Sequence, residues 1–145
     1  MTMRTFLNRT VLALSLLLIG LPIQAADWVI DPGNSLVTFR YAYGTDPYEG
    51  RFTNVQASFD IDPMSPTSCE FNVTINIADI EVDSPEVLDY LLDYELFDVD
   101  AWPTATFKAE KCRLTGVTSF EADGVLTIRD QTHPLTFPFD LSIET

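Results

Sequence analysis

Residues 69–77 read CEFNVTINI, and within this stretch every second side chain is apolar. Phe71, Val73, Ile75 and Ile77 alternate with polar neighbours, which is the two-residue period of a β-strand. Successive side chains of a strand point to opposite faces of its sheet. The alternation therefore predicts a strand with one buried face.

The same period recurs on both sides of this stretch. It predicts six strands, over residues 35–43, 50–62, 69–80, 104–114, 118–128 and 133–143. Turn-forming residues separate several of these strands, at 44–47, 63–67 and 130–134. The chain is therefore predicted to be all-β, with antiparallel strands.

One segment breaks the two-residue period and predicts a short helix. Ser84 is a plausible N-cap and Pro85 suits the first helical position. An apolar stripe at helical spacing has to lie on something apolar, and in a barrel the natural place is across one open end. We expect the helix to act as a lid, with its stripe over the barrel mouth and two aromatic residues anchoring its exit. The stripe residues of this lid are Leu88, Leu91 and Leu92, and the anchors are Phe97 and Trp102.

The N-terminus has the features of a secretory signal peptide. Arg4 and Arg9 precede or flank an almost wholly apolar run over 11–21, and Ala25 ends a plausible cleavage site. The alternative, a retained membrane anchor, needs about 20 apolar residues, and Pro22 ends this run too early. We expect export and cleavage after Ala25, which leaves residues 26–145 as one domain.

The composition excludes several classes of partner. Residues 1–25 hold two of the eight Lys and Arg and none of the 22 acidic residues, so the mature chain is strongly acidic. Nucleic acids and anionic membrane surfaces would repel it, and we expect no nucleic-acid partner and no stable membrane insertion. A hydrophobic content of 46% excludes a disordered acidic chain.

Cys69 and Cys112 are the two cysteines, and an exported protein is expected to join them. Strict alternation from Phe107 would place Cys112 on the face opposite Cys69. The apolar register shifts, however, from odd positions at Phe107 to even positions at Cys112. A β-bulge near residues 110–111 accounts for the shift and predicts a Cys69–Cys112 disulfide.

Catalytic and metal sites are tested by elimination. His133 is the single histidine and falls in a predicted turn, so a histidine metal site or a hydrolytic triad lacks its components. The acidic residues between 83 and 100 do not follow the spacing of a calcium-binding loop. We expect no enzyme activity, no metal and no cofactor.

Four stretches carry a resemblance to a known family. They are DWVIDPGNSLVTF (27–39), EGRFTNVQASFDIDP (49–63), LFDVDAWPTATFKAEK (96–111) and DGVLTIRDQTHPLTF (123–137). In this order they resemble the YceI-like family of periplasmic polyisoprenoid-binding proteins. The resemblance covers the whole mature chain.

The resemblance implies a lipocalin-like antiparallel barrel of eight strands that holds an isoprenoid lipid, such as a quinone tail or a polyprenyl chain, in the periplasm. The residues expected to line its interior are Phe39, Tyr41, Tyr43, Phe59, Phe71, Val73, Ile75 and Phe107. The alternative stays open, because such a barrel can fill with its own side chains. The chain would then be a non-enzymatic acidic interaction or stress-related module without a ligand.

Two departures from the family pattern limit what carries over. Many members have His-Ser where this chain has Asn34-Ser35, and a second histidine near Tyr43 or Gly44 is also absent. The glycine usual in the last hairpin is replaced by Asp130. Any role of those two histidines is absent here or performed by other residues.

The chain stops directly after the sixth predicted strand, whereas the family has two more. Strand 133–143 would then be an unpaired edge, guarded by Pro138. Either the chain lacks the closing strands, which we favour, or it forms a homodimer through this edge.

Overall fold

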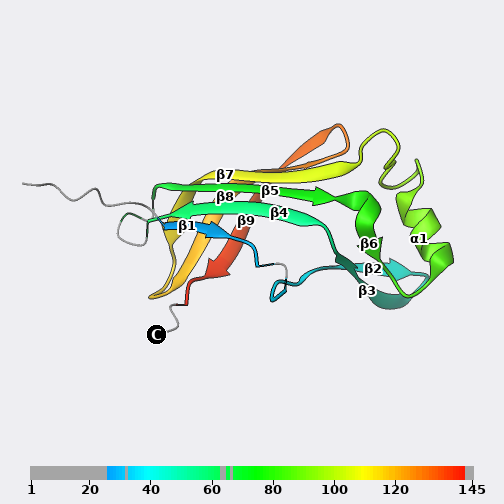
Figure 1. Cartoon of the computed structure of the whole chain (residues 1–145), viewed down its shortest axis with the longest axis horizontal. Helices are drawn as coiled ribbons and strands as arrows, with labels where there is room; N and C mark the ends of the chain where they lie inside the picture. The colour runs from blue at the N-terminus through cyan, green and yellow to red at the C-terminus, as the bar shows by residue number, and fades with distance from the viewer. Residues whose placement is uncertain (1–25, 32, 63–64, 66, 143–145) are drawn as a thin grey trace, which may run out of the picture.

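The computed structural model describes residues 26–31, 33–62, 65 and 67–142, and the predicted signal peptide lies outside them. The described chain forms two antiparallel sheets and one α-helix (Figure 1). A six-stranded sheet has the order β1 (Ala26–Val29), β4 (Val55–Ile61), β5 (Cys69–Asn76), β7 (Thr104–Leu114), β8 (Ser119–Ile128), β9 (Gln131–Asp140). A three-stranded sheet has the order β2 (Val37–Tyr43), β3 (Asp46–Phe52), β6 (Ile80–Glu81). The all-β, antiparallel prediction is confirmed.

The predicted closed barrel is wrong for the described residues. β1 and β9 are the two edges of the six-stranded sheet, and each pairs with one strand only. Two predicted strands are also divided: residues 50–62 form β3 and β4, while residues 69–80 form β5, a 3₁₀ turn (Ile77–Asp79) and β6. Hydrogen bonds cause the first break, since the Thr53 amide donates to the Asp79 carbonyl at 3.2 Å and the Asn54 side chain donates to the Asp79 carboxylate at 2.8 Å. The strands on either side of the predicted turn at 44–47, β2 and β3, therefore pair with each other and with β6 in a separate sheet.

The six-stranded sheet has one apolar and one polar face. Its registers place Phe59 opposite Phe71, Phe71 opposite Ala109, and Ala109 opposite Gly124. The buried core follows this face: Ile61, Cys69, Phe71, Phe107, Ala109, Cys112 and Ala122. The opposite face carries Asn72, Thr74 and Lys108, as the alternation in the sequence predicts.

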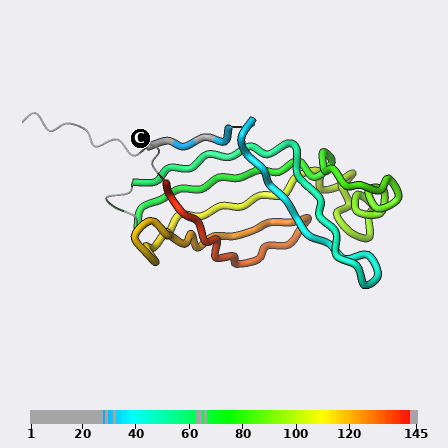
Figure 2. Tube along the Cα trace, turned by 90° about the horizontal axis from the view of Figure 1, so that it is seen from below, coloured from blue at the N-terminus to red at the C-terminus, as the bar shows by residue number. Residues whose placement is uncertain are grey.

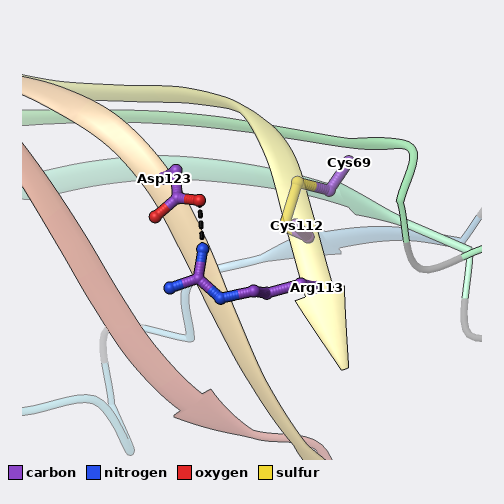
Figure 3. The surroundings of a disulfide bond; sticks show 4 residues. All are labelled: Cys69, Cys112, Arg113 and Asp123. Carbon is purple, nitrogen blue, oxygen red and sulfur yellow. Dashed lines mark hydrogen bonds and ion pairs between the residues drawn. A yellow bond between two sulfur atoms is a disulfide. The ribbon is translucent and has the colours of Figure 1, made fainter. Parts of the chain in front are cut away.

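The predicted disulfide and the predicted bulge are both present. The register between β7 and β8 shifts between Ala109 and Lys111, and Cys112 then lies on the apolar face. Its sulfur is bonded to that of Cys69, as Figure 3 shows. Arg113, the next residue, faces the other way and makes ion pairs with Glu121 and Asp123 (Figure 3 shows the latter). These contacts, with the hydrogen bond to Glu121 the largest cause, raise the pKa of the Arg113 guanidinium.

Helix α1 (Pro85–Leu92) forms where the sequence predicts it, with Ser84 as its N-cap residue. Leu91 is its buried residue. The helix lies at the end of the molecule that carries β2, β3 and β6 (Figure 1), rather than across the mouth of a barrel. The prediction that it closes one end of a barrel is therefore wrong, because the sheet beside it is a separate, open one.

The last hairpin also differs from the prediction. β8 and β9 are joined by the two residues Arg129 and Asp130, and Arg129 has a φ of 57°. His133 consequently lies within β9, opposite Leu126, and not in a turn. β9 is an edge, as predicted, but it contains Pro134 as well as Pro138. Pro134 and Pro138 are four residues apart, so their backbone nitrogens face the same side of β9, which is the open edge. Since proline has no N–H group, this edge lacks two hydrogen-bond donors, and pairing with another chain is less favourable.

Candidate functional site

The apolar face of the six-stranded sheet is strongly concave. Phe71 in β5 and Phe139 in β9 are three strand positions apart, which in a flat sheet is about 14 Å. Their ring centroids are only 5.0 Å apart. Phe107 and Phe137 similarly meet at 6.0 Å although β8 lies between their strands. The sheet therefore curls into a trough, and its far strand folds back over its centre. In Figure 2 the C-terminal end of β9 (red) crosses neighbouring strands of the sheet.

Small residues make this curvature possible. Ala109 and Ala122 are 2% and 0% exposed at the centre of the trough, where larger side chains would keep the phenyl rings apart. Gly124 lies beside them, and a Cβ there would come within 2.4 Å of the Lys108 carbonyl oxygen and 2.7 Å of the Phe107 ring. The sequence thus places small residues under large ones, which is how a concave apolar surface is packed.

A cavity of about 190 Å³ lies in the trough between its two edges. Its lining residues come from β1, β4, β5, β9 and the segment after β9, so both open edges contribute to it. All seven are apolar: Trp28, Phe59, Ile61, Phe71, Phe137, Phe139 and Leu141. Such a surface can hold an apolar group but offers no side chain for proton transfer.

Part of the trough is exposed to solvent. Trp28, Leu135 and Phe137 are 37%, 40% and 44% exposed, although each belongs to the apolar face. Burial of apolar surface stabilises a protein by about 25 cal/mol for each Å², and these exposed side chains do not contribute that stabilisation. A continuous exposed apolar surface of this kind is typical of a binding site.

The residues predicted to line a ligand site fall into two groups. Phe59, Phe71, Val73, Ile75 and Phe107 share the concave face, and two of them, Phe59 and Phe71, line the cavity. The other three are on β2 in the small sheet, where the first two contact each other and aromatic rings of β3, while the third is exposed. These three are Phe39, Tyr41 and Tyr43.

The residues predicted to form a lid are on α1 and the loop after it. Leu91 is buried, and Leu88 is half-buried beside β3 and β6. Leu92 and Phe97 are half-buried, whereas Trp102 is 40% exposed. None of these five residues lines the cavity in the trough.

Sequence reasoning did not assign five residues that line the cavity: Trp28, Ile61, Phe137, Phe139 and Leu141. The alternation at Phe137 and Phe139 was visible, and it marked them as one face of a strand. What it could not supply is the curl that brings β9 over β5, because that depends on contacts three strands apart.

The described residues hold no group of three or more His, Cys, Asp or Glu side chains arranged to bind a metal ion. His133 is exposed on β9 and does not line the cavity. Among the helices of the described chain, none combines the length and the apolar character that a membrane crossing requires.

Comparison with known proteins gives a consistent family match. The model of the YceI-like domain matches residues 28–145. A UPF0312 protein of Ectopseudomonas mendocina (strain ymp) is 28% identical over 127 residues, which cover 86% of this chain and 66% of the relative. A UPF0312 protein of Photorhabdus laumondii subsp. laumondii is 29% identical over 141 residues, covering 93% of this chain and 73% of the relative. The first of these shows that the chain spans slightly less than two thirds of that relative's length.

Solved structures show the same fold. BcnA of Burkholderia cenocepacia superposes with a TM-score of 0.75 at 23% identity, covering 80% of this chain and 73% of that one. A polyisoprenoid-binding domain from Saccharophagus degradans superposes with a TM-score of 0.55 at 12% identity, covering 79% of this chain and 66% of that one. At these identities the likeness concerns the fold alone.

Proposed function

This chain belongs to the YceI-like family, and from that premise we propose that it is a non-enzymatic carrier of a long isoprenoid lipid, of the quinone or polyprenyl type, in the periplasm. The lipid lies on the concave face of the six-stranded sheet. The observation that carries the proposal is the cavity between β1 and β9, whose lining is apolar at every residue. A fold neighbour from Saccharophagus degradans is a polyisoprenoid-binding domain, which supports the class of ligand.

The size of the cavity determines how such a lipid would bind. Its volume of about 190 Å³ is below the roughly 300–1,000 Å³ of sites that enclose a drug-sized ligand. The cavity therefore holds only part of a long chain. The remainder lies along the trough over Leu135 and Phe137, whose exposed surface it removes from water.

Charge supports an uncharged ligand in this trough. The residues that line the cavity include no basic or acidic side chain, and the whole chain has a formal charge of −14. A fatty acid or a phospholipid headgroup would enter without a partner for its negative charge, at a large cost in desolvation. A quinone or prenyl chain brings no charge and needs none.

One observation favours a second function. The Phe139 ring contacts the Phe71 ring across the trough and lies beside the Phe137 ring on its own strand. Phe71 is only 2% exposed. The centre of the trough is thus already filled by the protein itself. On this reading the chain is an acidic interaction module, and the exposed apolar residues at the edges contact a protein.

Organic extraction of the purified protein, followed by mass spectrometry, separates the two functions. The lipid proposal predicts a prenyl lipid at close to one equivalent, and saturable binding of a prenyl quinone after delipidation. Phe137→Ser is expected to weaken that binding, because Phe137 is a partly exposed residue of the cavity wall. Val117→Ser is the matched control, since Val117 is 98% exposed in the β7–β8 connection and lines no part of the cavity. If delipidated protein binds no prenyl quinone or prenyl alcohol, the lipid proposal is wrong.

A further inference from the structure

A second cavity, of about 590 Å³, lies between the small sheet and the start of α1. It is at the end of the molecule that carries α1, while β1 and the end of β9 lie toward the opposite end (Figure 1). None of its lining residues belongs to the trough. They are Tyr41, Tyr43, Tyr48, Asp83, Ser84, Glu86, Val87 and Tyr90.

Four tyrosine rings converge on this cavity from three elements. Tyr41 and Tyr48 are opposite one another in the β2–β3 ladder, and their rings stack with centroids 5.5 Å apart. Tyr43 is two residues further along β2, and Tyr90 faces them from α1. Tyr43, Tyr48 and Tyr90 are 59%, 43% and 50% exposed, so their rings are not used to build a core. The faces of such rings carry partial negative charge and attract cations.

The charged groups of the cavity have the same sign. Asp83 and Glu86 are both acidic, and no basic side chain lines the cavity. The basic residues of the small sheet are engaged elsewhere, because Arg40 pairs with Glu49 and Arg51 with Glu81. Within the described residues, neither Asp83 nor Glu86 has an ion-pair partner of its own.

The N-terminus of α1 also faces this cavity and has the opposite effect. A helix N-terminus carries about half a positive charge. Two full carboxylate charges and four ring faces outweigh it, so the net potential of the cavity is negative. An anionic ligand is therefore excluded, and a cation is favoured.

We propose that this cavity binds an organic ammonium cation, with a quaternary ammonium group held against the tyrosine rings. Aromatic rings recognise quaternary ammonium groups well, because these ions are large and weakly hydrated, so their desolvation costs little free energy. Asp83 and Glu86 supply the long-range attraction, while Tyr41, Tyr48 and Tyr90 supply the contact surface. The site is independent of the lipid trough and does not rest on the proposed function.

Choline is the probe, and the trimethylammonium proton signal is the readout. Ring currents are expected to move this signal upfield in a saturable way, with a dissociation constant in the millimolar range. The neutral isostere of choline, in which carbon replaces nitrogen, is expected to bind more weakly. Tyr48→Leu, Tyr90→Leu and Glu86→Gln are each expected to lower choline affinity about two- to fivefold.

Tyr94→Leu is the matched control, because Tyr94 is 68% exposed just after α1 and does not line the cavity. Tyr90 and Glu86 are exposed on α1, so their variants are expected to keep the melting temperature of the native protein. An ammonium group could belong to a free ion or to a lipid headgroup. Co-sedimentation with phosphatidylcholine vesicles would assign it to a headgroup, and choline binding without vesicle binding would assign it to a free ion.

Two results with the native protein would overturn the proposal. One is the absence of any saturable shift of the choline signal. The other is equal binding of choline and its neutral isostere, since this would mean that the cavity is merely apolar. Equal loss of affinity in the Tyr94→Leu control and the cavity variants would have the same consequence.

Discussion

Asp98 and Arg129 are the two residues other than glycine that have a positive φ among the described residues, at 49° and 57°, and their side chains face each other. The Asp98 Oδ2 atom lies 3.7 Å from the Arg129 Nη2 atom, and Arg129 Nη1 donates a hydrogen bond to the Leu96 carbonyl at 3.0 Å. These contacts join the loop after α1 to the β8–β9 turn. Each left-handed backbone costs about 1–3 kcal/mol, so the surrounding contacts must hold both residues in place.

Asp98→Asn tests this connection with little change of the backbone, because Asn also tolerates a positive φ. The substitution removes the charge, and we expect it to lower the free energy of unfolding by about 0.5–1 kcal/mol. Arg129→Ala removes both the ion pair and the hydrogen bond to the Leu96 carbonyl. Because these contacts help to hold residue 129 at its positive φ, we expect this variant to lose more stability than Asp98→Asn. Urea denaturation of both variants and of the double variant checks this. Strict additivity would show that the two side chains are not coupled.

The Cys69–Cys112 disulfide is expected to stabilise the fold substantially. It closes a loop with a sequence separation of 43, which in the chain-entropy model corresponds to about 3–4 kcal/mol. The double variant Cys69→Ser, Cys112→Ser is therefore expected to denature at a much lower urea concentration than the oxidised protein. Reduction of the native protein should reproduce most of this loss. Two free thiols in the unfolded, unreduced native protein would contradict the bond itself.

Gly124 is predicted to be required for the close approach of β7 and β8. In Gly124→Ala the new methyl group would overlap the Lys108 carbonyl and the Phe107 ring, so we expect a loss of about 1–3 kcal/mol. Gly116→Ala is the matched control, because there the new Cβ would come no closer than 3.2 Å to its nearest neighbour, Ser119. Thermal denaturation of the two variants decides the matter. Similar melting temperatures would show that the trough tolerates a side chain at position 124.

A substitution at Leu91 tests whether α1 contributes to lipid binding or only to the stability of the fold. Leu91 is 7% exposed, and Leu91→Ala is expected to cost about 2–4 kcal/mol by leaving a cavity. Because α1 is beside the small sheet and none of its residues lines the trough cavity, the lipid off-rate is expected to stay unchanged at temperatures where the variant is folded. A faster lipid off-rate would contradict this expectation and would indicate that α1 covers the bound lipid, as the sequence predicts.

The sequence predicted those features that depend on local patterns. The two-residue period located most strands, Pro85 and the leucine stripe located α1, and the parity shift before Cys112 located the bulge and the disulfide. These predictions are correct because alternation, capping and parity depend on residues that are neighbours in the sequence.

The features that the sequence missed depend on distant contacts. The break at 53–54 arises from hydrogen bonds to Asp79, which is 25 residues or more away. The curl of the sheet arises from Phe71 and Phe139, which alternation identifies only as buried residues. For the same reason the tyrosines of β2 were expected in one site with Phe71, whereas they line a separate cavity with α1.

The central claim, that the trough holds a prenyl lipid, is tested most directly through Trp28, which lines the cavity between β1 and β9. In the variant Trp102→Phe, Trp28 is the remaining tryptophan, and a prenyl quinone bound in the trough should quench its fluorescence. The delipidated variant is titrated with a prenyl quinone, and Trp28→Phe, which keeps Trp102 beyond α1, serves as the control. The account predicts saturable quenching of Trp28 and weak, non-saturable quenching of Trp102. Quenching of Trp28 that does not saturate, or saturable quenching seen only at Trp102, would contradict it.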